Sequence, residues 1–339
     1  MHLQNDINEL VTDSLGRLLA ERHPVDYART GPCWDEPGQR ELWRQLVAGG
    51  WLDIADPDAE NGLGHSGRLA IGELSGRALL TLPLAYHAMI AAPLVRYLAE
   101  TCPDVAADIV SQGGRDGPIA GGIYLRQRIP QLLDFEGQAT RFVQCRVNDR
   151  ASGSIALRIV DPADVESLES LDPCVRLGAI NADSGLLEST LWIDPDWLTR
   201  LLYRYFSFEL ADMIGAAAAA LDLSVVYAKE RVQFGRAIGE FHSIKHRLAD
   251  AWIALENARY ALSHFAQLTE GRIQDPGLQS AAGISWRLAR AAATNSTKLA
   301  IQVHGGLGFS WEHSAHLYLK RVLRLAARID ELAVTLNIA

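Results

Sequence analysis

The fold of this chain is decided by the stretch Tyr227-Ala228-Lys229-Glu230-Arg231-Val232-Gln233-Phe234-Gly235 and its continuation Phe241-His242-Ser243-Ile244-Lys245-His246-Arg247-Leu248-Ala249-Asp250. It joins two long helical patterns through a turn that contains glycine. An arginine before such a turn suits a pyrophosphate, because its guanidinium makes bidentate charge-assisted bonds and turn amides can point at an anion. A helix-ending turn explains Arg231 equally well, since a cation near a helix C-terminus also favours the helix dipole.

Helical patterns continue on both sides of this turn. Before it, Leu210 to Tyr227 includes an alanine run that lets a neighbouring helix approach closely. After it, apolar residues recur at alternating steps of three and four, at Phe241, Ile244, Leu248, Ala251, Leu255, Ala258, Leu262 and Phe265. This spacing is typical of a bundle seam. Two more helices are predicted, from Gly277 to Val303 and from His316 to Arg328, so we expect a C-terminal four-helix bundle.

A second glycine-rich loop follows the third of these helices, with the sequence Gln302-Val303-His304-Gly305-Gly306-Leu307-Gly308-Phe309. It is no dinucleotide fingerprint, because that motif requires a preceding strand and a following helix N-terminus. By itself it favours a glycine-rich helix stop. The alternative is a loop whose bare backbone lets a cofactor lie against it.

The rest of the chain divides into two regions. In the first third, apolar periodicity predicts helices that include Arg68 to Leu80 and Leu84 to Glu100, with a turn-rich loop from Asp56 to Ser66. From Pro118 to Asp194, short apolar runs alternate with turn residues, which indicates strands. We therefore expect a mainly α protein with an N-terminal helical domain (residues 1–117), a small antiparallel β domain (118–198) and a C-terminal helical bundle (199–339).

The composition excludes several classes of protein. With 339 residues, 48% of them hydrophobic and 22% charged, the chain is globular. A net charge of -9 argues against binding to nucleic acid or to an anionic membrane. Four scattered cysteines fit a reducing compartment. Because we find neither a signal-peptide pattern nor an apolar run of ~20 residues, we expect a cytoplasmic protein without a membrane span.

Together, the two loops resemble the acyl-CoA dehydrogenase family nearly residue for residue, and a weaker likeness covers much of the N-terminal third. The resemblance implies N-terminal helices, a middle β domain, a C-terminal four-helix bundle and FAD bound across a subunit interface. It also implies which residues bind the ADP half of a flavin that lies mainly in the neighbouring subunit: Arg231, Gln233, Phe234, Gln302, Gly305 and Gly306.

The family's proton-abstracting base has no clear counterpart. A carboxylate must lie in line with the α-carbon of the acyl thioester, on the face opposite the flavin. At one family position an ungapped count reaches Ile329, followed by Asp330 and Glu331, which on a continuing helix would point elsewhere. At the other position the count reaches Tyr205, and Glu209 lies one turn further along. A tyrosine with an ordinary pKa near ~10 is a poor base for this step.

The middle region also departs from the family. The Thr-Glu and Gly-Ser-Asp segments that meet flavin and substrate are absent between Pro118 and Asp149, where the chain reads Ala120-Gly121-Gly122-Ile123-Tyr124-Leu125. The chain thus keeps groups that serve a neighbour's flavin and lacks those of its own centre. This resembles the short base-less subunits of heterotetrameric (α2β2) bacterial acyl-CoA dehydrogenases, which act on steroids and other bulky acids beside a homologous, catalytically complete subunit.

Two alternatives stay open. The chain could form a self-sufficient homotetramer with Glu209 or Glu331 as base, or it could be a non-catalytic assembly scaffold. We expect no metal site, because His242 and His246 have ligand-compatible spacing on one helix but no acidic or cysteine partner. We expect Trp311 in the core, and His313 and His316 at the surface or as helix caps.

Overall fold

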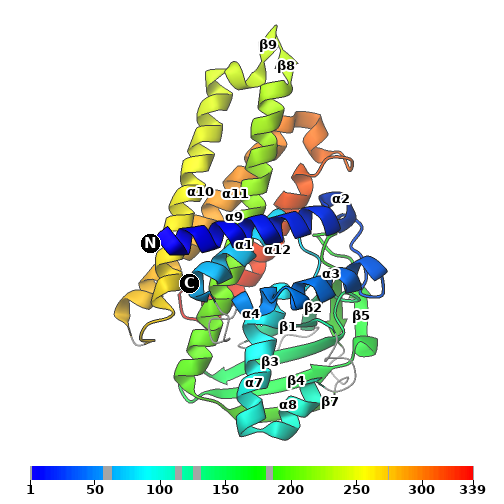
Figure 1. The fold of residues 1–339 in the computed structure, drawn as a ribbon, viewed down its shortest axis with the longest axis vertical. Coiled ribbons are helices and arrows are strands. Elements are labelled where there is room, and N and C mark those ends of the chain that lie inside the picture. The colour runs from blue at the N-terminus through cyan, green and yellow to red at the C-terminus, as the bar shows by residue number, and fades with distance from the viewer. Residues whose placement is uncertain are drawn as a thin grey trace.

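The predicted four-helix bundle is present in the computed structural model, which describes residues 2–55, 63–110, 117–124, 131–180, 186–273 and 275–338. Its helices are α9 (Pro195–Glu230), α10 (His242–Leu268), α11 (Pro276–His304) and α12 (Ala315–Thr335). They run side by side along the length of the molecule (Figure 1). The seam on α10 is buried at Leu248, Leu255, Ala258, Leu262 and Phe265, as its spacing predicts.

The central helix α9 begins earlier than the sequence pattern indicates. Asp194 caps it, since its carboxylate accepts a hydrogen bond from the backbone N–H of Trp197 at 2.7 Å, and Pro195 occupies the first turn. Over 18 residues α9 has a mean hydropathy of 1.5, enough by composition to cross a membrane, but 67% of that window is buried inside the protein. Its apolar character therefore belongs to a core helix.

Nine shorter helical segments form the N-terminal region among the described residues: α1 (His2–Arg22), α2 (Val25–Ala28), α3 (Pro37–Ala48), α4 (Trp51–Ala55), α5 (Gly64–Arg77), α6 (Leu84–Tyr86), the π-helix η1 (His87–Ala91), α7 (Ala92–Thr101) and α8 (Pro103–Val110). The predicted helix from Leu84 to Glu100 is thus interrupted by a π-helical turn just before Pro93, which lacks the backbone N–H of a regular helix. Helix α5 starts within the predicted loop, of which residues 56–62 lie outside the described part.

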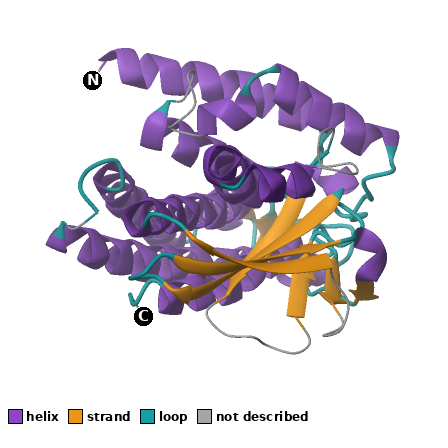
Figure 2. Cartoon of the chain, turned by 90° about the horizontal axis from the view of Figure 1, so that it is seen from below, coloured by secondary structure: helices purple, strands orange, loops and turns teal. Residues whose placement is uncertain are grey.

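The strands of the middle region, between β1 and β7, make two small sheets beside the helices (Figure 2). One has the order β1-β3-β4-β7, formed by β1 (Ile119–Tyr124), β3 (Arg141–Asp149), β4 (Ser154–Val160) and β7 (Leu186–Trp192). The other has the order β2-β6-β5, formed by β2 (Gln131–Asp134), β6 (Leu177–Ile180) and β5 (Val165–Leu168).

The prediction of a wholly antiparallel β region is wrong at one pair. Strand β1 runs parallel to β3, whereas the other pairs within the two sheets are antiparallel. Between β1 and β3 the chain passes through β2 of the other sheet, which allows β3 to run in the same direction as β1. Alternation of apolar residues carries no information on strand direction. Between β4 and β5, residues 162–164 form the short 3-10 helix η2 (Pro162–Asp164).

Candidate functional site

The first predicted loop lies at one extreme end of the bundle, as a hairpin of β8 (Val232–Gln233) and β9 (Arg236–Ala237) followed by η3 (Ile238–Glu240) (Figure 1). Arg231 is the C-cap of α9 and is exposed, so both explanations of this arginine agree with the structure. Phe234 has a φ of 52° and is 92% exposed. A left-handed backbone at a bulky residue is uncommon, and here it turns an aromatic ring into solvent.

The second predicted loop forms the 3-10 helix η4 (Gly305–Phe309) at the end of α11. Gly305, with a φ of 61°, ends that helix, which explains its glycine. A Cβ added at Gly305 or Gly306 would meet no atom within 4 Å, so the backbone here is open to an approaching molecule. Gln302 is exposed, and its Oε1 accepts a hydrogen bond from the Arg247 guanidinium at 2.6 Å.

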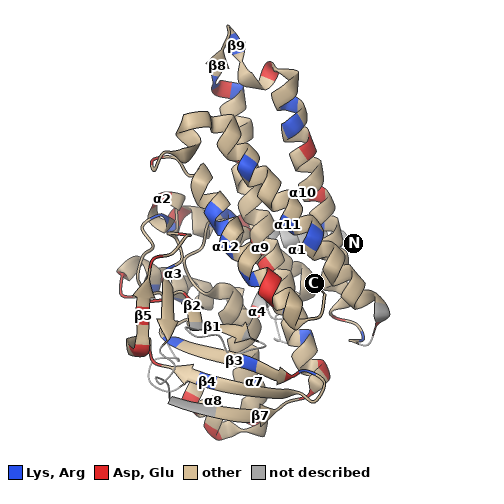
Figure 3. Cartoon of the chain, turned by 180° about the vertical axis from the view of Figure 1, so that it is seen from behind, with Lys and Arg blue, Asp and Glu red and all other residues tan. Residues whose placement is uncertain are grey.

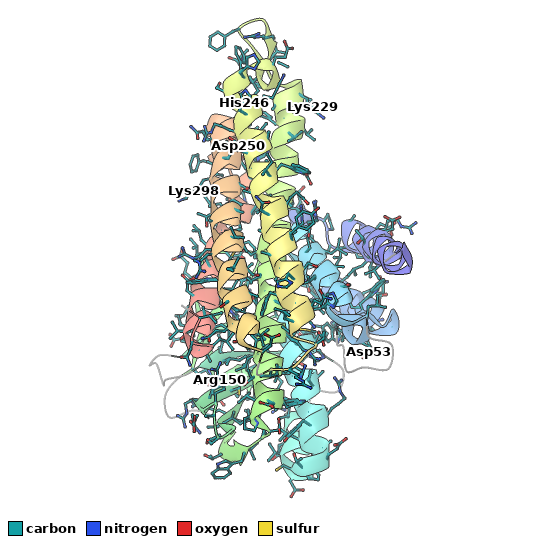
Figure 4. All side chains as sticks on the ribbon, turned by 90° about the vertical axis from the view of Figure 1, so that its left-hand side faces the viewer. Asp53, Arg150, Lys229, His246, Asp250 and Lys298 are labelled. Carbon is teal, nitrogen blue, oxygen red and sulfur yellow. The ribbon has the colours of Figure 1, made fainter. Side chains whose placement is uncertain are left out.

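The two loops belong to the same end of the bundle. The ring of Tyr227, one turn before Arg231, lies 4.5 Å from that of His304, the residue before Gly305. Figure 4 places Lys229, His246 and Asp250 toward this end, far from Arg150 beside the strands. We call this end the tip and define it by the residues 231–237 and 302–311.

The tip exposes an unusual set of large apolar side chains. Besides Phe234, Phe309 is 74% exposed, Val232 58% and Trp311 54%. The expectation that Trp311 lies in the core is wrong, because the turn after η4 carries it to the surface. His316, expected at the surface or as a helix cap, is buried, while His313 accepts a hydrogen bond from the backbone N–H of Ala315 at 3.1 Å and so caps α12.

The donors at the tip match the chemistry of a pyrophosphate. An exposed guanidinium, a side-chain amide and accessible glycine backbone are the groups that bind phosphate oxygens in proteins. Gln233 is less available to a ligand, since its amide already donates to the carbonyl of Val232 at 2.7 Å. The residues therefore fit the ADP half of FAD, provided that a second chain covers the apolar side chains beside them.

A cavity of about 400 Å³ lies elsewhere, between the β region and the bundle. Strand β1 contributes Gly121 and Gly122, and α9 and α12 contribute the four residues considered for the base. These four are Tyr205, Glu209, Ile329 and Glu331. The cavity thus occupies the position expected for this chain's own catalytic centre.

The structure corrects one expectation about the base and agrees with another. Glu331 lines the cavity, although we expected it to point elsewhere. Asp330 does point elsewhere, accepting hydrogen bonds from Trp286 at 3.1 Å and Arg290 at 2.9 Å. Glu209 is 6% exposed, and among the described residues its Oε2 has no hydrogen-bond partner. Burial raises the pKa of Tyr205 well above its usual value, which disfavours it as a base.

Three arginines of α12 lie at or beside one wall of this cavity, and two of them, Arg324 and Arg328, line it. They are spaced at i, i+3 and i+7, which places them on one helix face. We call the resulting set the α12 arginine network and define it by Arg321, Arg324 and Arg328 with Asp134, Asp172 and Asp212. Its shortest ion pairs join Asp134 to Arg324 at 2.6 Å and to Arg328 at 2.5 Å.

The network connects the β region to the bundle. Arg328 also donates to the Tyr205 hydroxyl at 2.5 Å, and Arg324 lies 3.2 Å from Asp172. Burial alone would raise the pKa of Asp134, but Arg324 and Arg328 lower it below its usual value. The sequence pattern alone does not predict this network. The arginine spacing on α12 was its only visible signal, because the acidic partners come from distant parts of the chain.

Elsewhere on the molecule, basic and acidic residues are interspersed along the helices and strands (Figure 3). The rings of His242 and His246 stack with their centroids 5.8 Å apart. Within the part of the chain that the structure describes, no three His, Cys, Asp or Glu residues gather as metal ligands would. The four cysteines, all in that part, form no disulfide.

Comparison with known proteins agrees with this architecture. A family model described as acyl-CoA dehydrogenase, C-terminal domain, matches residues 209–328. The chain is 40% identical over 321 residues to acyl-CoA dehydrogenase IpdE2 of Mycobacterium tuberculosis, an alignment that covers 92% of this chain and 90% of that protein.

Solved structures share the fold at lower identity. The ChsE4-ChsE5 complex from Mycobacterium tuberculosis has a TM-score of 0.74 at 20% identity and covers 99% of this chain and 96% of that chain. The Tcur3481-Tcur3483 steroid ACAD G363A variant has a TM-score of 0.74 at 19% identity, with 98% and 96% covered.

Fold, tip chemistry and relatives together define a FAD-dependent oxidoreductase that acts on acyl-CoA. The chain belongs to the acyl-CoA dehydrogenase family. The predicted family, fold class, enzyme class and cofactor are thereby confirmed.

Proposed function

We propose that this chain is the base-less subunit of a heteromeric acyl-CoA dehydrogenase. In this role Arg231, Phe234, Gln302 and the Gly305–Gly306 backbone bind the ADP half of a flavin held mainly by a homologous, catalytically complete subunit. That partner supplies the base, most of the acyl pocket and the contacts to the flavin ring. When bound, FAD would supply the acceptor for the hydride of the β-carbon of the acyl thioester, while the partner's base would take the α-proton.

The observation that carries the proposal is the contrast between the two ends of the bundle. At the tip, phosphate-binding groups and four large apolar side chains face outward, where a second chain can cover them. At the cavity, Ile329 stands at one base position and Arg328 bonds the tyrosine at the other. A volume of about 400 Å³ suits one drug-sized molecule, whereas the reaction needs a flavin ring and an acyl thioester together.

Relatives support the partner and the substrate class. Two solved structures with this fold are named for a pair of proteins, ChsE4-ChsE5 and Tcur3481-Tcur3483. The second is described as a steroid ACAD. By that analogy we propose an α2β2 assembly, a bulky or steroid-derived acyl group, a place in lipid or steroid degradation, and a cytoplasmic location.

One observation favours a second candidate, a self-sufficient homotetramer. Glu209 and Glu331 line the same cavity, and Glu209 has a carboxylate oxygen without a partner among the described residues. Either carboxylate would then act as base in this chain's own centre. The α12 arginine network opposes this candidate, because it occupies part of the space between β2 and α12.

Purification of the chain alone and together with its companion tests the proposal. We expect colourless protein from the chain alone and yellow, active protein from the pair, with one FAD per unlike pair. Changing Arg231→Ala in the pair should weaken FAD binding at least about tenfold, because charge-assisted bonds contribute about 1.5–3 kcal/mol. An unchanged flavin content would instead favour the scaffold role.

The base candidates separate the two enzymatic roles. Glu209→Gln and Glu331→Gln in this chain should leave the turnover rate of the pair within about threefold. Loss of two or more orders of magnitude from either change, or yellow and active protein from this chain alone, would identify a self-sufficient enzyme.

A further inference from the structure

Arg29, on the N-terminal region, holds the turn that follows η4. It is the C-cap residue of α2, yet its guanidinium donates to the backbone carbonyls of Trp311 and Glu312, the latter at 3.3 Å, and to the Ser314 hydroxyl at 3.2 Å. Its side chain is only 11% exposed. The bonds span more than 280 residues of sequence, so they join two separate parts of the fold.

These bonds satisfy groups that the local structure leaves unpaired. Ser314 is the N-cap of α12 but makes no side-chain cap bond, and the turn before it is irregular. A planar fork of donors fits two adjacent carbonyls and a hydroxyl at once, which a lysine ammonium cannot reproduce in the same geometry. Arg29 therefore fixes where the chain leaves the tip.

Arg247, on α10, acts at the other end of the same segment. Its guanidinium donates to Oε1 of Gln302 at 2.6 Å. Since a guanidinium can only donate, this contact identifies the oxygen of the amide and turns the Nε2 hydrogens away from Arg247. An outward-facing donor is the form of the amide that binds an anion.

We propose that Arg29 and Arg247 are positioning residues for FAD binding, because they hold the 302–314 segment at both ends in the conformation that receives the ADP half of the partner's flavin. This inference rests on the proposed function. Neither arginine needs to touch the cofactor. Each acts through the segment, by reducing the number of conformations that must be frozen when FAD binds.

The experiment measures the dissociation constant of FAD for the apo form of the pair by flavin fluorescence. Arg29→Ala and Arg247→Met should each raise it about tenfold. Arg40→Ala serves as control for the first, since Arg40 is an exposed arginine whose guanidinium donates to the carbonyl of Asp35, five residues earlier, at 2.8 Å. Arg287→Met, an exposed position on α11, serves for the second.

A positioning role makes two further measurements informative. Saturating FAD should restore the kcat and KM of both variants, and both variant chains should still assemble with the companion subunit. Should Arg29→Ala fail to assemble, Arg29→Lys keeps the charge without the fork and should still weaken FAD binding.

The outcomes distinguish this inference from the function on which it rests. If Arg231→Ala weakens FAD binding but Arg29→Ala and Arg247→Met leave it within about twofold of the control variants, the positioning role is wrong and the proposed function stands. If Arg231→Ala also has no effect, the proposed function fails first.

Discussion

At the scale of single residues, the α12 arginine network contains ion pairs that are almost completely buried. Arg321 is 1% exposed and lies 2.9 Å from Asp172 and 3.5 Å from Asp212. Burial raises the pKa of Asp212 to about 6, even though Arg321 opposes the shift. At neutral pH this carboxylate is therefore charged in a place that disfavours its charge, and one of its oxygens lacks a hydrogen-bond partner among the described residues.

This position gives a pH-dependent prediction. Because the pKa of Asp212 is higher in the folded state than in the unfolded state, its contribution to stability is present at low pH and is lost as the pH rises through about 6. Between pH 5 and pH 8, wild type should lose about 1 kcal/mol of unfolding free energy relative to Asp212→Asn. Denaturant titrations at both pH values measure this difference.

The matched control is Asp222→Asn, a change at a carboxylate that is 65% exposed and pairs with Arg77. It should show no comparable difference between pH 5 and pH 8, since exposed pairs contribute little. A stability gap between wild type and Asp212→Asn that stays constant over this range would contradict the pKa shift.

At the scale of elements, the close approach of α5 to α9 fixes the position of the N-terminal region. The alanine run of α9 predicts such an approach, and α5 meets it with glycines. A Cβ added at Gly76 would lie 1.9 Å from the carbonyl oxygen of Asp212, and one added at Gly215 would lie 2.0 Å from that of Glu73. Neither helix can move away without opening the core between them.

The change Gly76→Ala should therefore destabilise the chain by about 3 kcal/mol, despite the higher helix propensity of alanine. Gly16→Ala on α1 is the control, because a Cβ there would meet its nearest neighbour, Leu74, at an ordinary 3.7 Å. That control should be neutral or slightly stabilising. Equal effects of the two changes on the melting temperature would show that the helices are not in contact at Gly76.

At the scale of the whole molecule, the tip and the cavity lie at separate places along the bundle and have opposite character. The tip exposes aromatic and phosphate-binding groups, whereas the cavity is crossed by ion pairs between the β region and α12. An exposed apolar surface next to a charged binding loop marks an interaction site. Under the proposed function, a single chain presents half of a cofactor site and an altered centre of its own.

Replacing Phe234 tests whether the tip is the surface that contacts a partner subunit. Phe234→Ala should leave the melting temperature of the isolated chain unchanged, because the ring is 92% exposed, but should lower the flavin content and association of the pair. Trp192→Ala is the control, since this residue is also exposed, by 72%, but lies on β7 far from the tip. Retention of full flavin content in Phe234→Ala would argue against a partner at the tip.

The sequence by itself determined the mainly helical architecture and the bundle seam, and its resemblance to a known family determined the family and the FAD cofactor. Local spacing carries the information on helices and seam, because helix faces and glycine turns are properties of residues close together in the chain. The ungapped counts to Ile329 and Tyr205 lead to residues that line one cavity together with Glu209. Glu331, which was expected to point elsewhere, lines that cavity as well.

Only the tertiary structure decided three features: the parallel pairing of β1, the exposure of Trp311 and the α12 arginine network. The network joins Asp134, Asp172 and Asp212 to arginines more than 100 residues away, and no local pattern records such a pairing. The same holds for Arg29, whose partners follow it by about 280 residues. Contacts of this kind depend on how the elements pack, so they become visible only when the fold is complete.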